Sequence, residues 1–214
     1  MLADFLRVLE GLFPSLDPAD IRTALISFQR HGIVWPDLYA SALPPSINQG
    51  DILTSIDLAL PDMDGTLALF SGPAMLLSRS CDFDHDSHVI LAACRPFVDY
   101  AKTGAAGYLK KNTVLSKLYL ERVPTLGTIL VDLSAVGTVR VDTIQRDLQA
   151  GRLARVSSFT MSGYYLLVAK LTAHLLRPHG LDEIRGTSTP TFRRRLVEAT
   201  RQLGPLLRYV ATGR

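Results

Sequence analysis

The stretch from Gln49 to Pro96 decides the predicted fold, and it reads QGDILTSIDLALPDMDGTLALFSGPAMLLSRSCDFDHDSHVILAACRP. Three short apolar runs begin near Gly50, Gly72 and His88, and residues typical of turns separate them. Short apolar runs bounded by turn residues are typical of consecutive strands. The stretch therefore predicts antiparallel strands that curl into a small barrel.

The order of these runs resembles the MazF/PemK (Kid/CcdB-like) toxin family. In that family a Gly-Asp-Ile strand, an Arg-Pro-Ala-hydrophobic-Ser strand and a hydrophobic strand ending in Thr-Ser follow one another. The likeness is carried here by Gly50-Asp51-Ile52, by Gly72-Pro73-Ala74-Met75-Leu76-Leu77-Ser78 and by His88 to Pro96. It continues through Val131 to Leu153, which is similar to a late strand and short helix of the family.

This resemblance covers about residues 49–177 and implies an SH3-like barrel that cleaves RNA. The predicted fold class is therefore α+β, an SH3-like (MazF/PemK-type) antiparallel β-barrel with added N- and C-terminal helices. Three segments follow from it: an N-terminal helical extension over residues 1–46, the barrel domain with its C-terminal helix over residues 47–177, and a basic helical tail over residues 178–214.

The sequence departs from the family where the chemistry would lie. Gly72 stands at the family's Arg position, and the family's Thr position falls near Cys94 or Arg95. An RNA-cleaving site needs a cation that stabilises charge on the phosphate and a group that moves protons. Arg95 is the candidate cation, and Asp51 on the first predicted strand is a tentative carboxylate.

Two functions therefore stay open. In the first, the chain is a non-catalytic component of a bacterial toxin-antitoxin or phage-defence system that binds a partner or nucleic acid. In the second, it is a toxin-like endoribonuclease that cleaves single-stranded RNA. The missing Arg at Gly72 favours the first. A fold alone does not decide between them, because one barrel hosts many functions.

Basic residues suggest where a polyanion or an acidic partner would bind. Residues 171–214 hold eight Arg against three acidic residues, while residues 1–170 carry a small acidic excess. A basic amphipathic helix of this kind can bind nucleic acid or an acidic partner. The candidate binding residues are Lys110, Lys111 and Lys117 beside Tyr108 and Tyr119, and Arg193, Arg194 and Arg195 in the tail. A solvated outer strand face with protective lysines is the simpler interpretation of the first group.

The segment between the second and third apolar runs predicts a hairpin turn centred near residues 84–85. That register pairs Cys94 near Met75 and separates Cys81 from Cys94 by roughly 20 Å, which excludes a disulfide between them. The turn carries Cys81, Asp82, His85 and His88. Side chains of these types can bind a metal ion, or a histidine can act as the base for a reactive Cys81 thiol. A solvated polar turn explains them more simply, and we predict no cofactor.

Composition limits the location of the protein. No apolar run reaches the ~18–20 residues needed to cross a bilayer, and the first residues lack the basic start of a signal peptide. The sequence thus predicts a cytoplasmic protein without a membrane span. Its potential partners are an antitoxin or other protein, RNA, and a second copy of the chain.

Overall fold

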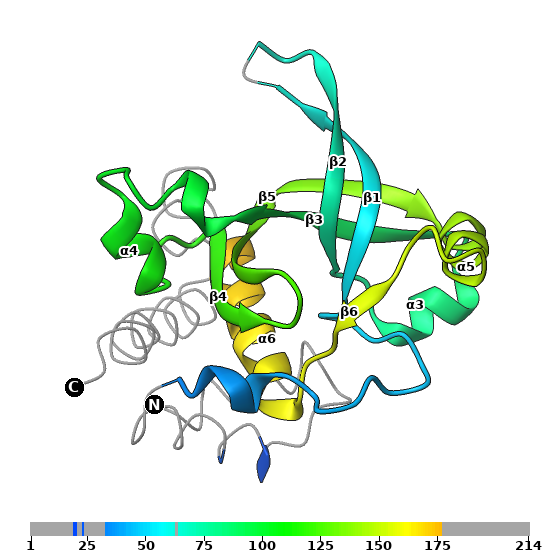
Figure 1. The fold of residues 1–214 in the computed structure, drawn as a ribbon, viewed down its shortest axis with the longest axis horizontal. Coiled ribbons are helices and arrows are strands. Elements are labelled where there is room, and N and C mark those ends of the chain that lie inside the picture. Colours follow the sequence, from blue (N-terminus) through cyan, green and yellow to red (C-terminus); the bar gives the residue numbers. More distant parts are fainter. Residues whose placement is uncertain (1–18, 21–22, 24–32, 63, 177–214) are drawn as a thin grey trace, which may run out of the picture.

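A computed structural model describes residues 19–20, 23, 33–62 and 64–176 (Figure 1). The helices predicted before residue 33 lie almost wholly outside these residues. The predicted tail helix, with Arg193, Arg194 and Arg195, lies outside them altogether.

A single antiparallel sheet organises the described residues. Its strands follow the order β4-β5-β3-β2-β1-β6, and every described pairing is antiparallel. The predicted α+β class is confirmed. β4 and β6 lie at the two ends of the strand order and do not pair with each other, so the described sheet does not close into the predicted barrel. The strands are β1 (Ile52–Pro61), β2 (Leu67–Leu76), β3 (His88–Pro96), β4 (Lys117–Val123), β5 (Gly127–Arg140) and β6 (Arg155–Ser157).

Helices cover the two faces of this sheet. On one face, α6 packs with η1 over a core that contains Ile52, Met75 and Val131. On the other face, α3 and α5 contribute Phe83 and Ile144 to a second core. The helices are η1 (Trp35–Leu38), α3 (Ser80–His85), η2 (Phe97–Asp99), α4 (Ala106–Lys110), α5 (Val141–Gln149) and α6 (Met161–Leu176). Within the described residues, no helix has the length and apolar character that crossing a membrane requires.

The Gly72-Pro73 step does not separate two strands, as the sequence had suggested. Strand β2 runs through it without interruption. Its register with β1 shifts between Leu53 and Ile56, where Ala74 and Gly72 are the respective partners. Pro73 therefore lies at a bulge, where a residue without an N–H group breaks no regular ladder.

The predicted turn between β2 and β3 is wrong, because the helix α3 occupies it. The backbone N–H of Arg79 donates to Asp82 Oδ2 at 2.9 Å, and Phe83 is buried. This local bond and the burial of one aromatic ring favour a helical turn over an extended one. Met75 consequently pairs with Ala92, two residues from the Cys94 partner that was predicted.

The outer half of the β1–β2 hairpin projects away from the rest of the sheet (Figure 1). Its inner face buries Leu58 and Leu60, and Leu58 lies so close to Gly137 of β5 that an added Cβ there would be 3.2 Å away. On its outer face Leu67 and Leu69 are 74% and 73% exposed. The outer half of the hairpin therefore packs against the rest of the described sheet through its inner face only.

Candidate functional site

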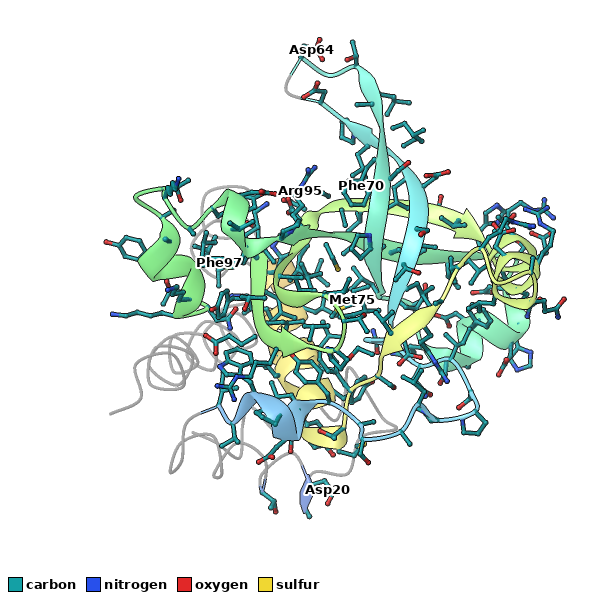
Figure 2. The ribbon with its side chains drawn as sticks, in the orientation of Figure 1. Asp20, Asp64, Phe70, Met75, Arg95 and Phe97 are labelled. Atoms are coloured by element: carbon teal, nitrogen blue, oxygen red, sulfur yellow. The ribbon has the colours of Figure 1, made fainter. Side chains whose placement is uncertain are left out.

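The Arg95 side chain lies near the end of β3, at the base of the projecting hairpin (Figure 2). Its guanidinium carbon is 5.2 Å from the centroid of the Phe70 ring on β2. Gly72 makes room for this ring, because an added Cβ at Gly72 would come within 2.9 Å of it. Arg95, Phe70 and Gly72 thus share one corner of the molecule.

The positive charge of Arg95 is not neutralised by the described part of the chain. None of the ion pairs found among the described residues includes it. Arg95 is half-buried, and the π face of Phe70 stabilises its charge without removing it. An arginine in this state can bind an anion at low cost, because no existing ion pair must be broken.

A second aromatic side chain, Tyr100, lies within the electrostatic reach of Arg95. Burial raises the pKa of the Tyr100 phenol, the Arg95 charge lowers it, and the carboxylates of Asp132 and Asp99 raise it, with a net upward shift. The phenol therefore stays protonated at neutral pH and can donate a hydrogen bond. Tyr100 follows directly on η2, so that short helix sets its position.

Of the two carboxylates that raise the pKa of Tyr100, Asp132 of β5 is buried and Asp99 is exposed. Lys117 of β4 donates to Asp132 Oδ2, while the backbone N–H and the hydroxyl of Ser134 donate to Oδ1 at 3.1 and 2.6 Å. Burial acts to raise the pKa of Asp132, but the hydrogen bonds and the charge of Lys117 outweigh it, so the pKa lies below its usual range. Asp132 is therefore ionised, both of its carboxylate oxygens accept hydrogen bonds, and Lys117 forms an ion pair with it.

The two lysines predicted beside Tyr108 lie on and next to α4. Lys110 Nζ is 5.6 Å from the centroid of Phe97, and both Lys110 and Lys111 are exposed. Phe97 packs edge-on against Tyr119 with the ring centroids 4.9 Å apart. Lys110 and Lys111 are accessible to an anion in solvent. Lys110 also contacts the Phe97 ring, which packs on Tyr119.

Asp51 does not share a site with Arg95. Asp51 is fully buried, its Oδ2 is 3.0 Å from Arg155 Nη1, and its backbone carbonyl accepts from Leu76 N–H. Leu76 pairs with Leu91, four residues before Arg95 on β3, which places Asp51 roughly 13 Å or more away along the sheet. Asp51, the tentative catalytic carboxylate, thus forms a buried ion pair with Arg155.

The candidate functional turn holds no assembled site either. Cys81, Asp82 and His85 lie on α3, and the Cys81 sulfur is 3.5 Å from its neighbour Asp82 Oδ1. His88 begins β3, and its Nδ1 is 2.8 Å from Ser87 Oγ. Among the described residues, no group of three or more His, Cys, Asp or Glu side chains is arranged to hold a metal ion. Cys81 is exposed, Cys94 is buried and both are free thiols, as the sequence predicted.

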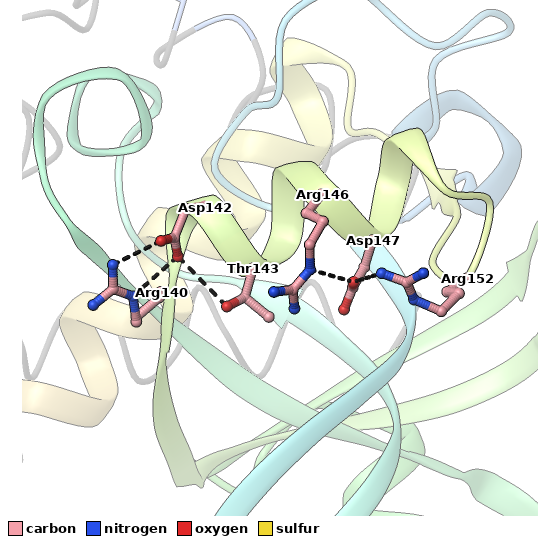
Figure 3. A network of polar contacts seen from close by, with 6 residues as sticks. All are labelled: Arg140, Asp142, Thr143, Arg146, Asp147 and Arg152. Carbon is pink, nitrogen blue, oxygen red and sulfur yellow. Dashed lines mark hydrogen bonds and ion pairs between the residues drawn. The ribbon is translucent and has the colours of Figure 1, made fainter.

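The exposed arginines of α5 and its flanks are paired with acids (Figure 3). Arg140 makes two hydrogen bonds to the Asp142 carboxylate, at 3.0 and 2.6 Å. Asp147 accepts from both Arg146 and Arg152. This network is a weaker anion site than Arg95, because each guanidinium already has a carboxylate partner.

Sequence reasoning singled out Arg95 and Lys117 but missed Phe70, Tyr100 and Asp132, which complete their surroundings. The only local signal for Phe70 was an aromatic residue in an alternating strand two positions before Gly72. The chain matches no protein-family model, no curated protein and no solved structure. The resemblance to the toxin family therefore stays a prediction.

Proposed function

We propose that this protein binds single-stranded RNA without cleaving it, as a MazF/PemK-like component of a bacterial toxin-antitoxin or phage-defence system. One observation carries the proposal. The Arg95 guanidinium has no carboxylate ion-pair partner in the described residues, lies over the ring of Phe70, and acts electrostatically on the phenol of Tyr100.

This combination suits a single nucleic-acid strand. A guanidinium forms paired hydrogen bonds to phosphate oxygens, and an aromatic face stacks on an unpaired base whatever its sequence. Tyr100 adds a hydrogen-bond donor for a phosphate or a sugar. Lys110 and Lys111 add positive charge on the segment that follows β3, where Lys110 lies over the ring of Phe97 on η2. A duplex would present its bases stacked, so the aromatic groups favour a single strand.

The non-catalytic part of the proposal rests on the neighbouring proton-transfer groups. Asp132 is ionised, with both oxygens bonded, and its low pKa makes it a weak base. The raised pKa of Tyr100 keeps its proton on the phenol. His85 lies on α3, and His88 is seven residues from Arg95 along β3, or roughly 23 Å. Phosphate binding without proton transfer is what these groups support.

The test is a titration of fluorescently labelled single-stranded RNA with the wild-type chain and three variants. Arg95→Ala and Phe70→Leu should each weaken binding by about tenfold or more, since a hydrogen bond from a charged group or a base stack is worth ~1–3 kcal/mol. Arg146→Ala is the matched control, because it removes one arginine from the network on α5. Equal affinities of Arg95→Ala and Arg146→Ala for the RNA would contradict the proposed site.

An endoribonuclease is the second candidate, because the Arg95 guanidinium, which has no ion-pair partner in the described residues, is the kind of cation that such an enzyme needs. Such an enzyme needs the guanidinium to stabilise the transition state, a contribution of ~3–4 kcal/mol. Incubation with single-stranded RNA should then yield cleavage products, and Arg95→Ala should abolish both the cleavage and any growth arrest on expression. Stable RNA in the presence of a protein that binds it would leave only the binding function.

A further inference from the structure

The β2 strand has an edge with which no described strand pairs. Its pairing with β3 includes only Ala74, Met75 and Leu76. From Leu67 to Pro73 the strand pairs with β1 on one side, and no described strand pairs with the other. At ~3.3 Å per residue this open edge is roughly 20 Å long.

The open edge also lacks the usual protection against strand pairing. Residues 65–78 contain no charged side chain, and Leu67 and Leu69 on the outer face are 74% and 73% exposed. Monomeric proteins usually protect such edges with lysines, prolines, bulges or a covering loop. Pro73 blocks only the inner end of the edge, so Leu67 to Gly72 remains able to pair.

From these features we infer that β2 pairs with β2 of a second copy of this chain, antiparallel and about a two-fold axis at Leu69. The axis would place Leu69 opposite its own copy and Leu67 opposite the second copy's Ser71. Leu67, Leu69 and Ser71 all point to the outer face, because side chains two residues apart on a strand lie on the same face. The two hairpins would then form one four-stranded ribbon with the exposed leucines packed together.

Charge complementarity selects a second copy as the occupant. In the antiparallel arrangement, the tip of each hairpin points toward the base of the other, where Arg95 lies beside β2 (Figure 2). The tip carries Asp64, whose carboxylate accepts from the Thr66 N–H and hydroxyl at 2.9 and 2.7 Å. The backbone hydrogen bond from Thr66 is the main cause that keeps the pKa of Asp64 below its usual range, so the tip is anionic at neutral pH. Two-fold symmetry supplies this attraction twice.

Sedimentation velocity of the full chain over a wide concentration range tests the inference, which does not depend on RNA binding. The wild type should show a reversible monomer–dimer equilibrium. Leu69→Lys should abolish the dimer, because it places two like charges on the axis. Val98→Lys is the control, since Val98 is also 73% exposed but lies on η2, away from the edge. Both side chains are exposed, so circular dichroism should confirm unchanged folding.

A thiol cross-link tests the register. In a Cys81→Ser background, which removes the exposed native thiol, Leu69→Cys should oxidise to a covalent dimer and Val98→Cys should not. Asp64→Arg should weaken the dimer, and Arg95→Asp in the same chain should restore it. A wild-type monomer at every concentration would overturn the inference. So would a dimer that survives Leu69→Lys, or equal cross-linking of the two cysteine variants.

Discussion

The Lys170 ammonium, completely buried on α6, donates to the backbone carbonyl of Asn112 at 2.6 Å. Asn112 lies in the turn between α4 and β4, and its side chain in turn donates to the Tyr119 carbonyl and accepts from the Tyr119 N–H. Burial lowers the pKa of Lys170 from 10.5 to about 7. A single lysine therefore connects the long helix to the turn that holds the aromatic cluster.

This lysine predicts a pH dependence of stability. The unfolded chain binds the Lys170 proton up to about pH 10 and the folded chain only up to about pH 7. Between these values the unfolded state binds more protons, so the free energy of unfolding should rise with pH, by at most about 1.4 kcal/mol per unit. The burial penalty is fully present below about pH 7.

Lys170→Met should remove that slope while keeping a side chain of similar length. The variant loses the bond to Asn112, worth ~1 kcal/mol, but also a burial penalty on the order of 4 kcal/mol at neutral pH. It should therefore be more stable than the wild type near pH 7, with the difference shrinking toward pH 10. Urea unfolding at several pH values measures both, with Lys111→Met as an exposed control. A wild-type stability that is flat over this range contradicts the prediction.

The buried pair of Asp51 and Arg155 should be important for folding. Arg155 also donates to the Pro44 and Ser46 carbonyls, so it connects β6 to the chain that enters β1. Arg155→Met should cost ~3–5 kcal/mol, because it leaves a buried carboxylate without its charge partner. Arg140→Met breaks the exposed pair with Asp142 and should leave the unfolding midpoint almost unchanged. Similar losses in the two variants would show that the burial of Asp51 has little energetic weight.

The two cysteines should differ in reactivity. Cys81 is exposed on α3, whereas Cys94 is buried and burial raises the pKa of its thiol. A maleimide should label one thiol in the native protein and the second only after denaturation. Mass spectrometry without reductant should detect no bridge between Cys81 and Cys94. A bridged species would contradict the pairing of β2 with β3.

The tail can be tested apart from the site at Arg95. Truncation after Leu176 removes all of the formal excess positive charge of residues 171–214, because their eight Arg and three acidic residues all follow Leu176. RNA affinity should fall and its dependence on salt should become shallower, because fewer counterions are released. The loss of affinity on Arg95→Ala should persist in the truncated chain. An unchanged salt slope after truncation would show that the tail does not contact the RNA.

The two proposals also predict that RNA binding and self-association exclude each other, because both use the positive charge of Arg95. Saturating single-stranded RNA should shift the wild-type equilibrium toward monomer in sedimentation velocity. Leu69→Lys, measured at high protein concentration, should bind RNA at least as tightly as the wild type. A dimer that binds RNA with full affinity would contradict the shared use of Arg95.

Local patterns in the sequence determined most of the sheet. Apolar runs and turn residues predicted strands close to β1 and β3, since strand formation depends on which face of a few consecutive residues is buried. The same reasoning was wrong at Gly72-Pro73 and at α3. A bulge in β1 accommodates the proline, and the burial of Phe83 overrides the polar composition of the turn.

Only the tertiary structure decided what surrounds Arg95. Phe70, Tyr100 and Asp132 come from β2, from the segment after η2 and from β5, and their proximity depends on strand register and sheet order rather than on spacing along the chain. The burial of Lys170 and the open edge of β2 were equally invisible in the sequence. An isolated residue type reports its own chemistry, but its charge state and neighbours depend on contacts between segments that are distant in sequence.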